Sequence, residues 1–442
     1  MIQPNIPDTG QARIVIVGGG FGGISLAKQL KNAPFQVVLL DRNNYHLFQP
    51  LLYQVATAGL EPESIAFPLR GIFNKQKNLH FRMAEVKRVR PADNILETSI
   101  GEIRYDHLVL ATGSNTNFFG NKAIEEHAIG MKSLIEAVQI RNYVVKQFEE
   151  ALLMPSEAEI KPKLNFVMVG GGPTGVELAG AFAELKQHIL PKDYPELPLH
   201  LMNVYLIEAG PRLLAAMSET SSRKTEEGLR KIGVQVMCNV AVKTYDGQVL
   251  QLSNGETIQS QSLIWSAGVK GVPIEGLPAE AILPNGRVLV DDHNLVRGAH
   301  NIYTIGDAAQ MTNDPAFAKG YPMVAQVAIQ QGRNLGHNFM AALRQQPLKP
   351  FAYKDLGSMA TIGRNRAVAE VAGMKLSGFI AWMAWMAVHL MTLMGFRNKL
   401  VVFTNWCYRY FTYDRGTRII IKRGAANITK LRQIVQDTRY EG

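Results

Sequence analysis

The chain has 442 residues, a formal net charge of +10 and an apolar fraction of 47%. This length exceeds what one hydrophobic core holds, so two or three domains are expected, and the apolar fraction excludes general disorder. The two cysteines, Cys238 and Cys407, lie far apart and have no C-x-x-C partner. The sequence therefore argues against a disulfide framework, an iron–sulfur cluster and a redox centre built from a cysteine pair.

A strand, a glycine-rich turn, a helix and a second strand open the chain. Arg13–Val17 is a short β-branched run, Ile24–Leu30 has a helical pattern, and Gln36–Leu40 is an apolar run that ends at Asp41. This order predicts the start of a parallel α/β unit. An acid at the end of the second strand is placed to bind the hydroxyl groups of a ribose.

The turn itself has three glycines at the spacing G-x-G-x-x-G. Such a turn is tight, lets a pyrophosphate approach the backbone, and allows the helix to pack closely on the strand. The positive end of the following helix favours the same anion. The predicted first nucleotide site consists of Gly18, Gly20, Phe21, Gly23, Asp41 and Arg42.

The whole pattern recurs in the middle of the chain, which is stronger support than either copy alone. Leu164–Val169 is predicted as a strand, Val176–Lys186 as a helix, and Val204–Ile207 as a strand that ends at an acid. The second nucleotide site is predicted at Gly170, Gly172, Gly175 and Glu208.

The acid of the second site predicts which nicotinamide cofactor binds there. A carboxylate at Glu208 accepts hydrogen bonds from a 2′-hydroxyl and repels a 2′-phosphate, which favours NADH over NADPH. Arg212 is close by in the sequence and argues in the other direction.

Three further apolar strands end in small residues or an acid. In open parallel sheets, ligands bind beyond these carboxyl ends. The residues concerned are Thr112 and Gly113, Ala267 and Gly268, and Asp307. The sequence thus predicts an α/β fold with two Rossmann-like domains, in which one nucleotide stays bound and the other exchanges. The obvious reaction is hydride transfer from a nicotinamide to a flavin. We place the FAD-binding domain at residues 11–125 and 291–345, and the NADH-binding domain at residues 160–290.

Four segments make the chain resemble a known family. They are Val15–Gly23 with Asp41, Phe48–Gln54, Tyr303–Ala308 and Ala325–Gly332. Through them nearly the whole chain resembles a type II NADH:quinone oxidoreductase, a member of the flavoproteins with two dinucleotide-binding domains. The resemblance implies bound FAD, NADH as substrate, a membrane quinone as acceptor and no proton pumping.

The resemblance also implies roles for single residues. Asp307 would bind the ribityl chain of FAD, and Thr112 would lie with Gly113 against the flavin nucleotide. Gln326 and Gln330 would lie at the quinone end of a helix under the flavin ring. Their i, i+4 spacing places both on one helix face. The alternative is a solvated face.

Two charged residues, Glu177 and Lys375, each have a functional and a purely structural interpretation. The resemblance places Glu177 near the nicotinamide and flavin, where it would relay protons; alternatively it is an acid that favours a helix N-terminus. Lys375 precedes the most apolar stretch of the chain. It is expected to approach the flavin or the quinone, or else to act as an interfacial anchor.

Residues 350–442 are expected to form a membrane-associated region. Gly378–Phe396 is 19 residues long and almost wholly apolar, with Trp382 and Trp385 near its start. Basic residues follow, which attract anionic lipids. They are Arg397, Lys399, Arg409, Arg415, Arg418, Lys422 and Arg423. We expect two helices in the plane of the interface, with a spanning helix or a buried dimerisation helix as alternatives.

These features predict a peripheral enzyme on the cytoplasmic face of the cell inner membrane. Its expected partners are a quinone and an anionic lipid surface, with a homodimer left open; no nucleic acid and no metal are expected. Alternative functions are a sulfide:quinone oxidoreductase, a soluble reductase for a protein such as ferredoxin, and a nucleotide-sensing module. The first would need redox cysteines near the flavin, and the second would not need the apolar C-terminal region.

Overall fold

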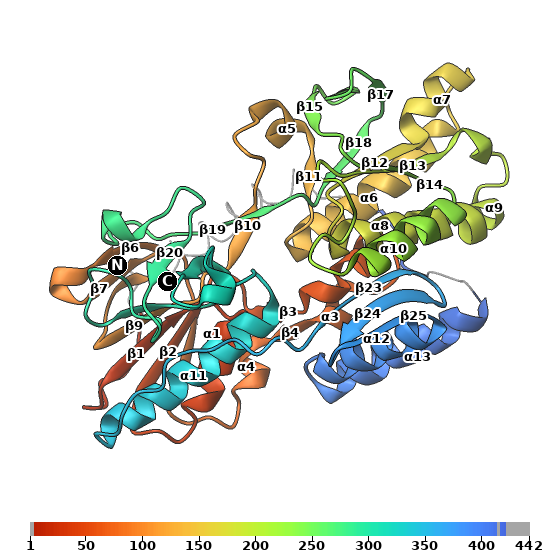
Figure 1. The fold of residues 1–442 in the computed structure, drawn as a ribbon. Helices are drawn as coiled ribbons and strands as arrows, with labels where there is room; N and C mark the ends of the chain where they lie inside the picture. The colour runs from red at the N-terminus through yellow and green to blue at the C-terminus, as the bar shows by residue number, and fades with distance from the viewer. Residues whose placement is uncertain (1–3, 413–415, 421–442) are drawn as a thin grey trace, which may run out of the picture.

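The computed structural model describes residues 4–412 and 416–420. Part of the expected membrane-associated region therefore lies outside the described residues, including Arg415, Lys422 and Arg423. Two lobes built on parallel sheets lie side by side, and a C-terminal layer covers one of them (Figure 1). The expected α/β fold is confirmed.

The first lobe is built on a five-stranded parallel sheet in the order β21-β9-β1-β2-β5. Its central strand β1 is completely apolar after its first residue, as expected for a strand covered on both faces. The strands are β1 (Arg13–Val17), β2 (Gln36–Asp41), β5 (Leu79–Met83), β9 (His107–Leu110) and β21 (Ile302–Thr304).

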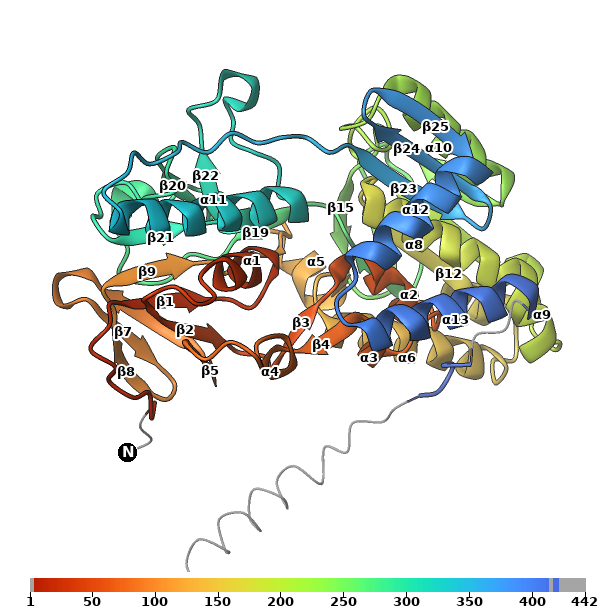
Figure 2. The same cartoon turned by 90° about the horizontal axis from the view of Figure 1, so that it is seen from below.

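Two helices pack together on this sheet, and glycines let them approach closely. They are α1 (Phe21–Gln29) and α11 (Ala325–Leu343), which lie against each other in Figure 2. A Cβ atom added at Gly332 of α11 would lie 2.5 Å from the carbonyl oxygen of Gly22 in α1. Residues far apart in the chain therefore form one wall of the lobe.

The second lobe repeats the plan with a parallel sheet in the order β11-β18-β12-β13-β14. The strands are β11 (Ile129–Gly130), β12 (Asn165–Val169), β13 (Asn203–Ile207), β14 (Val234–Met237) and β18 (Ser262–Trp265). The helices of this lobe include α6 (Leu134–Ala151), α8 (Pro173–Glu184) and α10 (Glu219–Lys231). Helix α8 begins before the expected Val176 because Pro173, at the first helical position, is compatible with helix and needs no N–H partner.

The C-terminal layer is an antiparallel sheet followed by two helices. Its strands are β23 (Ser358–Gly363), β24 (Arg366–Val371) and β25 (Met374–Gly378). The apolar stretch that follows does not form one helix. It breaks after α12 (Phe379–Thr392), turns through Gly395 at φ +80°, and continues as α13 (Phe396–Thr412). The expected pair of helices is present, and no helix within the described residues has both the length and the apolar character to cross a bilayer.

Buried residues of α12 and α13 belong to the same hydrophobic core as the second lobe. Trp385, Val402 and Trp406 pack with residues of α8 and of α2 (Leu52–Ala56). The opposite faces of the two helices carry large exposed apolar side chains. These are Phe379, Ile380, Met383, Val388, Met391, Phe396, Leu400, Phe403, Tyr408 and Phe411. We call this surface the apolar belt; an exposed patch of this kind marks a protein or membrane interaction site.

The remaining elements complete the two lobes and their connections. The remaining helices are α3 (Pro62–Ile65), α4 (Leu69–Ile72), α5 (Lys122–His127), α7 (Glu157–Leu164) and α9 (Leu190–Asp193). The remaining strands are β3 (Tyr45–Leu47), β4 (Ala66–Pro68), β6 (Val86–Arg90), β7 (Ile95–Thr98), β8 (Gly101–Arg104), β10 (Ser114–Thr116), β15 (Val242–Tyr245), β16 (Val249–Leu252), β17 (Thr257–Gln259), β19 (Val269–Gly271), β20 (Val288–Val290) and β22 (Ala309–Met311).

Candidate active site

The two glycine turns have nearly the same geometry. Gly18 has φ +113° and Gly170 has φ +112°, a region that favours glycine. A Cβ atom at Gly23 would lie 1.9 Å from the carbonyl oxygen of Gly18, and one at Gly175 would lie 1.9 Å from that of Gly170. The first and third glycine of each motif are therefore required by the fold.

The middle glycine of each motif has a different role. No atom lies within 4 Å of a Cβ position built on Gly20 or on Gly172. Each glycine precedes the first turn of a helix, α1 or α8, so free backbone N–H groups point into open space. That combination fits a pyrophosphate in both turns.

An acid accompanies each turn, as predicted. The Asp41 carboxylate accepts a hydrogen bond from the N–H of Gly19 at 2.6 Å, and Glu208 accepts one from the N–H of Gly171 at 2.5 Å. Burial raises the pKa of Asp41 above its ordinary value, while backbone donors oppose this change. Both carboxylates are held beside a glycine turn, where the ribose of a nucleotide would lie.

A cavity of about 1060 Å³, the main cleft, runs between the lobes. It begins at the first glycine turn and reaches Pro173 and Thr174 at the start of α8. The cleft thus contains the first glycine turn and touches the second one at Pro173 and Thr174, whereas the predicted residues Gly170, Gly172, Gly175 and Glu208 do not line it. The predicted residues that line it are Gly18, Gly20, Phe21, Asp41, Arg42, Thr112, Gly113, Glu177 and Asp307.

Asp307 lies in a polar cluster that the sequence did not reveal. Its carboxylate accepts a hydrogen bond from Ser114 Oγ at 2.5 Å, and Lys132 Nζ lies 3.5 Å away. The preceding Gly306 N–H donates to Gln331 Oε1 at 2.7 Å, which fixes the turn. Lys132 lines the main cleft but belongs to no local motif, so only the three-dimensional structure identifies it.

Several predicted site residues lie elsewhere. The Gln330 side chain forms two hydrogen bonds with the backbone of Lys354. Among the described residues, neither Gln326 nor Gln330 lines the main cleft or the other two cavities. The residues of α11 that line the main cleft are Ala325 and Ala328 instead.

The other predicted residues that do not line the cleft lie in the C-terminal sheet and at the second turn, apart from Gly23, which packs under the first turn. Lys375 is exposed on β25, where strand alternation decides its direction, and it does not line a cavity in the described part of the chain. Ala267 packs against Gly170, and Gly268 has φ +77° next to it. These two residues therefore shape the second glycine turn.

Glu177 is an almost completely buried acid at the inner end of the main cleft. Its side chain is 8% exposed and lies on α8. Its Oε1 atom accepts hydrogen bonds from the Thr361 N–H at 3.4 Å and from Trp385 Nε1 at 3.1 Å. Burial raises the pKa of Glu177 to about 8, although both donors lower it. The carboxyl group is therefore largely protonated at neutral pH.

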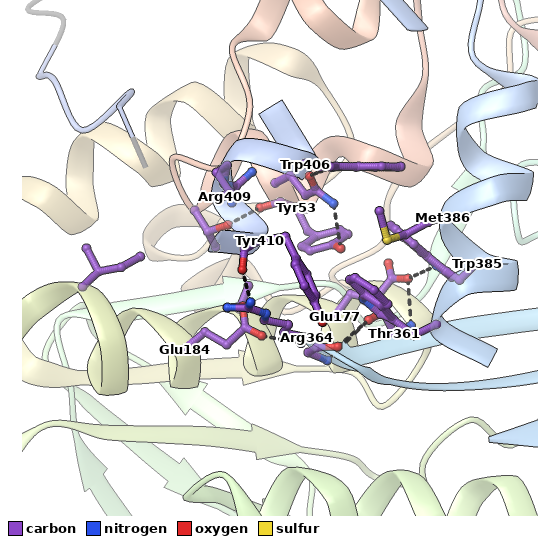
Figure 3. A pocket seen from close by; sticks show the side chains of 16 residues that line it. Tyr53, Glu177, Glu184, Thr361, Arg364, Trp385, Met386, Trp406, Arg409 and Tyr410 are labelled. Carbon is purple, nitrogen blue, oxygen red and sulfur yellow. Dashed lines mark hydrogen bonds between the residues drawn. The ribbon is translucent and has the colours of Figure 1, made fainter. Parts of the chain in front are cut away.

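A second cavity, the inner pocket, lies on the other side of Glu177 and is shown in Figure 3. It has a volume of about 120 Å³, and aromatic and apolar side chains, mainly from α2, α8, α12 and α13, form about half of its lining. Charged side chains also line it, namely Glu177, Glu184, Arg364 and Arg409. Tyr53 and Glu177 line both the main cleft and the inner pocket. These two side chains thus form the boundary between a nucleotide-sized space and the smaller inner pocket.

Aromatic stacking holds Trp385, a hydrogen-bond donor to Glu177, in place. The rings of Trp385 and His389 are stacked with centroids 4.1 Å apart, and His389 Nδ1 lies 2.7 Å from the Trp385 carbonyl oxygen. Burial lowers the pKa of His389 to about 4, so this ring is neutral at physiological pH. His389 also lines the main cleft.

Two parallel-sheet lobes, each with a glycine turn shaped for a dinucleotide and an acid beside it, are the plan of an oxidoreductase with two nucleotide-binding domains. Comparison with known proteins agrees. The family model described as pyridine nucleotide-disulphide oxidoreductase matches residues 12–332, and the NDH2 C-terminal domain matches residues 356–413.

Similar proteins cover almost the whole chain. The type II NADH:quinone oxidoreductase Ndh of Mycobacterium tuberculosis is 34% identical over 98% of this chain and 96% of its own length. The external NADH-ubiquinone oxidoreductase 2 of Saccharomyces cerevisiae mitochondria is 29% identical over 90% of this chain and 81% of its own. The chain therefore belongs to the pyridine nucleotide-disulphide oxidoreductase family and, within it, to the type II NADH:quinone oxidoreductases.

Solved structures confirm the fold. NDH2 from Plasmodium falciparum in complex with NADH superposes with a TM-score of 0.85 at 22% identity, over 93% of this chain and all of that chain. The sulfide:quinone oxidoreductase of Aquifex aeolicus has a TM-score of 0.69 at 20% identity over 95% of each chain. The latter likeness concerns architecture alone.

Proposed function

We propose that this protein is a membrane-bound NADH:quinone oxidoreductase that contains FAD and does not pump protons. One observation supports this most strongly. Glu177 lines both the main cleft, which contains the first nucleotide turn and reaches the start of α8, and the inner pocket, which the C-terminal helices help to wall. In this arrangement, NADH, the flavin and an apolar acceptor can meet at one buried carboxyl group.

Residues of the main cleft would bind and orient the two nucleotides. Gly20 and Gly172 leave the backbone open to the pyrophosphates. Asp41 and Glu208 would bind the riboses, and Asp307 the ribityl chain. FAD held by these residues would supply the redox chemistry, namely acceptance of a hydride from NADH and delivery of two electrons to a quinone.

The inner pocket is the proposed place of the quinone head group. Because the pKa of Glu177 is about 8, its carboxyl group holds a proton at neutral pH. The carboxyl could give this proton to a quinone oxygen and take another from water. Trp385 and Thr361 orient the carboxyl through their hydrogen bonds. Tyr53, on the same boundary, would help to exclude water.

The apolar belt would bring the inner pocket to the lipid. Trp382 and Met386 of α12 and Tyr410 of α13 line the pocket, while other faces of the same helices are exposed and apolar. We propose peripheral attachment to an anionic lipid surface, on the cytoplasmic face of the cell inner membrane where NADH is available. A homodimer stays a prediction that sedimentation of the purified protein would test.

Stopped-flow absorbance tests the proposed function directly. NADH should bleach the oxidised-flavin spectrum of the purified protein, and a soluble quinone analogue should restore it. Absence of bleaching would indicate a protein that senses nucleotides without turnover. Bleaching without recovery would exclude quinone as the acceptor and favour a protein partner.

A further inference from the structure

A third cavity lies at the link between α12 and α13, away from Glu177. It has a volume of about 450 Å³, within the usual range of small-ligand pockets, roughly 300–1,000 Å³. Elements from both ends of the chain form it. The side chains that matter for its chemistry are Lys28, Phe67, Ile72, Leu393, Phe396 and Lys399. We call this cavity the lysine pocket.

Two ammonium groups give the lysine pocket its charge. Lys28 comes from α1 and Lys399 from α13. Neither lysine takes part in an ion pair between described residues. Lys399 Nζ donates one hydrogen bond, to the carbonyl oxygen of Met391 at 2.7 Å. A lysine ammonium has three N–H donors, so donors remain for a ligand. Lys28 is exposed, and the neighbouring protein lowers its pKa by partial burial of the ammonium group.

The rest of the wall is apolar and continues into the apolar belt. Phe67, Ile72 and Leu393 line the interior. Phe396, which is 82% exposed, also lines the pocket, and Met391, 72% exposed, lies in the adjoining turn of α12. The pocket therefore presents two cations and an apolar groove at the edge of the surface that would contact lipid.

We propose that the lysine pocket binds one anionic phospholipid, with its phosphate between Lys28 and Lys399 and an acyl chain along Phe67 and Ile72. A charged head with an apolar tail matches this surface. A quinone has no charge for the lysines, and a nucleotide would leave the apolar wall uncovered. A zwitterionic lipid carries an ammonium group that the two lysines repel.

The bound lipid would act on the link between the two helices. Gly395 in this link packs against the ring of Phe67, where an added Cβ atom would lie 2.3 Å from a ring carbon. A ligand that covers Phe67 and contacts both α1 and α13 would hold the link in place. This site rests on the proposed membrane attachment, but it does not depend on the identity of the electron acceptor.

Native mass spectrometry of the full-length, FAD-loaded protein in detergent tests the proposal. Phosphatidylglycerol and phosphatidylcholine with identical chains are added in turn. We expect one phosphatidylglycerol to be retained per chain and phosphatidylcholine to be retained about tenfold less or weaker still. Equal retention of both lipids would overturn the site, and so would release of phosphatidylglycerol by inorganic phosphate.

Three variants separate the pocket from general surface charge. Lys28→Ala combined with Lys399→Ala should lower retention about tenfold or more. Ile72→Trp keeps both lysines but fills the groove, and it should lower retention as well. Lys87→Ala removes one exposed lysine on β6 and should have no effect. Unchanged retention in the double variant or in Ile72→Trp would refute the proposal.

The same samples distinguish this proposal from the proposed function. FAD content and thermal melting show whether each variant is folded. Turnover with a soluble quinone analogue should be the same in all of them. Loss of lipid retention with full turnover supports the site, whereas full lipid retention without turnover would count against the function alone.

Discussion

Replacing Glu177 by glutamine should change both stability and turnover, in different ways. Glutamine has nearly the same shape and can still accept the hydrogen bonds from Thr361 and Trp385, which the carboxyl now accepts. It cannot carry a proton. The pH dependence of the variant therefore isolates the titration of this single group.

The effect on stability follows from the pKa shift. Burial raises the pKa of Glu177 from 4.5 to about 8, so between these pH values the folded chain binds a proton that the unfolded chain has lost. The free energy of unfolding therefore falls as pH rises through this range, by up to about 5 kcal/mol at roughly 1.4 kcal/mol per pKa unit. Glu177→Gln removes this fall. Relative to the parent, the variant should gain stability as pH rises.

Thermal melting between about pH 5 and pH 9 measures this difference. The melting temperature of Glu177→Gln minus that of the parent should rise steadily across the range. Glu256→Gln, on an exposed hairpin between β16 and β17, is the matched control and should show no trend. A difference that stays constant with pH would show that Glu177 does not titrate there.

Turnover gives the second measurement. Loss of a positioned proton donor typically costs about 10²–10⁴-fold in rate. The kcat of Glu177→Gln for quinone reduction should therefore fall by about 100-fold or more, while the FAD content stays that of the parent. Unchanged steady-state kinetics would refute the proposed role of Glu177.

Three further substitutions have defined outcomes. In Gly175→Ala the new Cβ atom would lie 1.9 Å from the Gly170 carbonyl oxygen, so NADH binding by titration should be lost while FAD remains. Glu208→Ala removes the acid that disfavours a 2′-phosphate, and the ratio of kcat/KM for NADPH to that for NADH should rise about tenfold or more; an unchanged ratio would contradict this role. Trp385→Phe removes a donor that lowers the pKa of Glu177, so the alkaline limb of the pH–kcat profile should move to higher pH.

The two nucleotide lobes were predictable because their signals are local. A glycine spacing, a β-branched run before it and an acid at the end of the next strand all lie within one βαβ unit. The structure confirms strands at Arg13–Val17 and Ser262–Trp265 with unchanged bounds. The first residues of α1 and α8 were predicted too late in the chain, because each glycine turn leads directly into its helix.

The inner site depends on contacts that no local pattern contains. The hydrogen bond between Trp385 and Glu177 joins residues 208 positions apart. The i, i+4 spacing of Gln326 and Gln330 correctly places both on one face of α11, but spacing alone does not say what that face contacts. Lys375 was associated with the site because it precedes an apolar stretch, whereas a residue on a strand points to whichever side its register dictates.

One face of α12 holds the proton-carrying acid through Trp385, and the opposite face belongs to the apolar belt. A single helix is thus both a wall of the proposed quinone pocket and the part of the protein that lipid would contact. Removing the bilayer as a whole, in contrast to emptying the lysine pocket alone, should therefore disturb the chemistry at Glu177 as well as the location of the protein. A solubilised preparation should show an altered acidity of Glu177, and returning the protein to a bilayer should reverse the change.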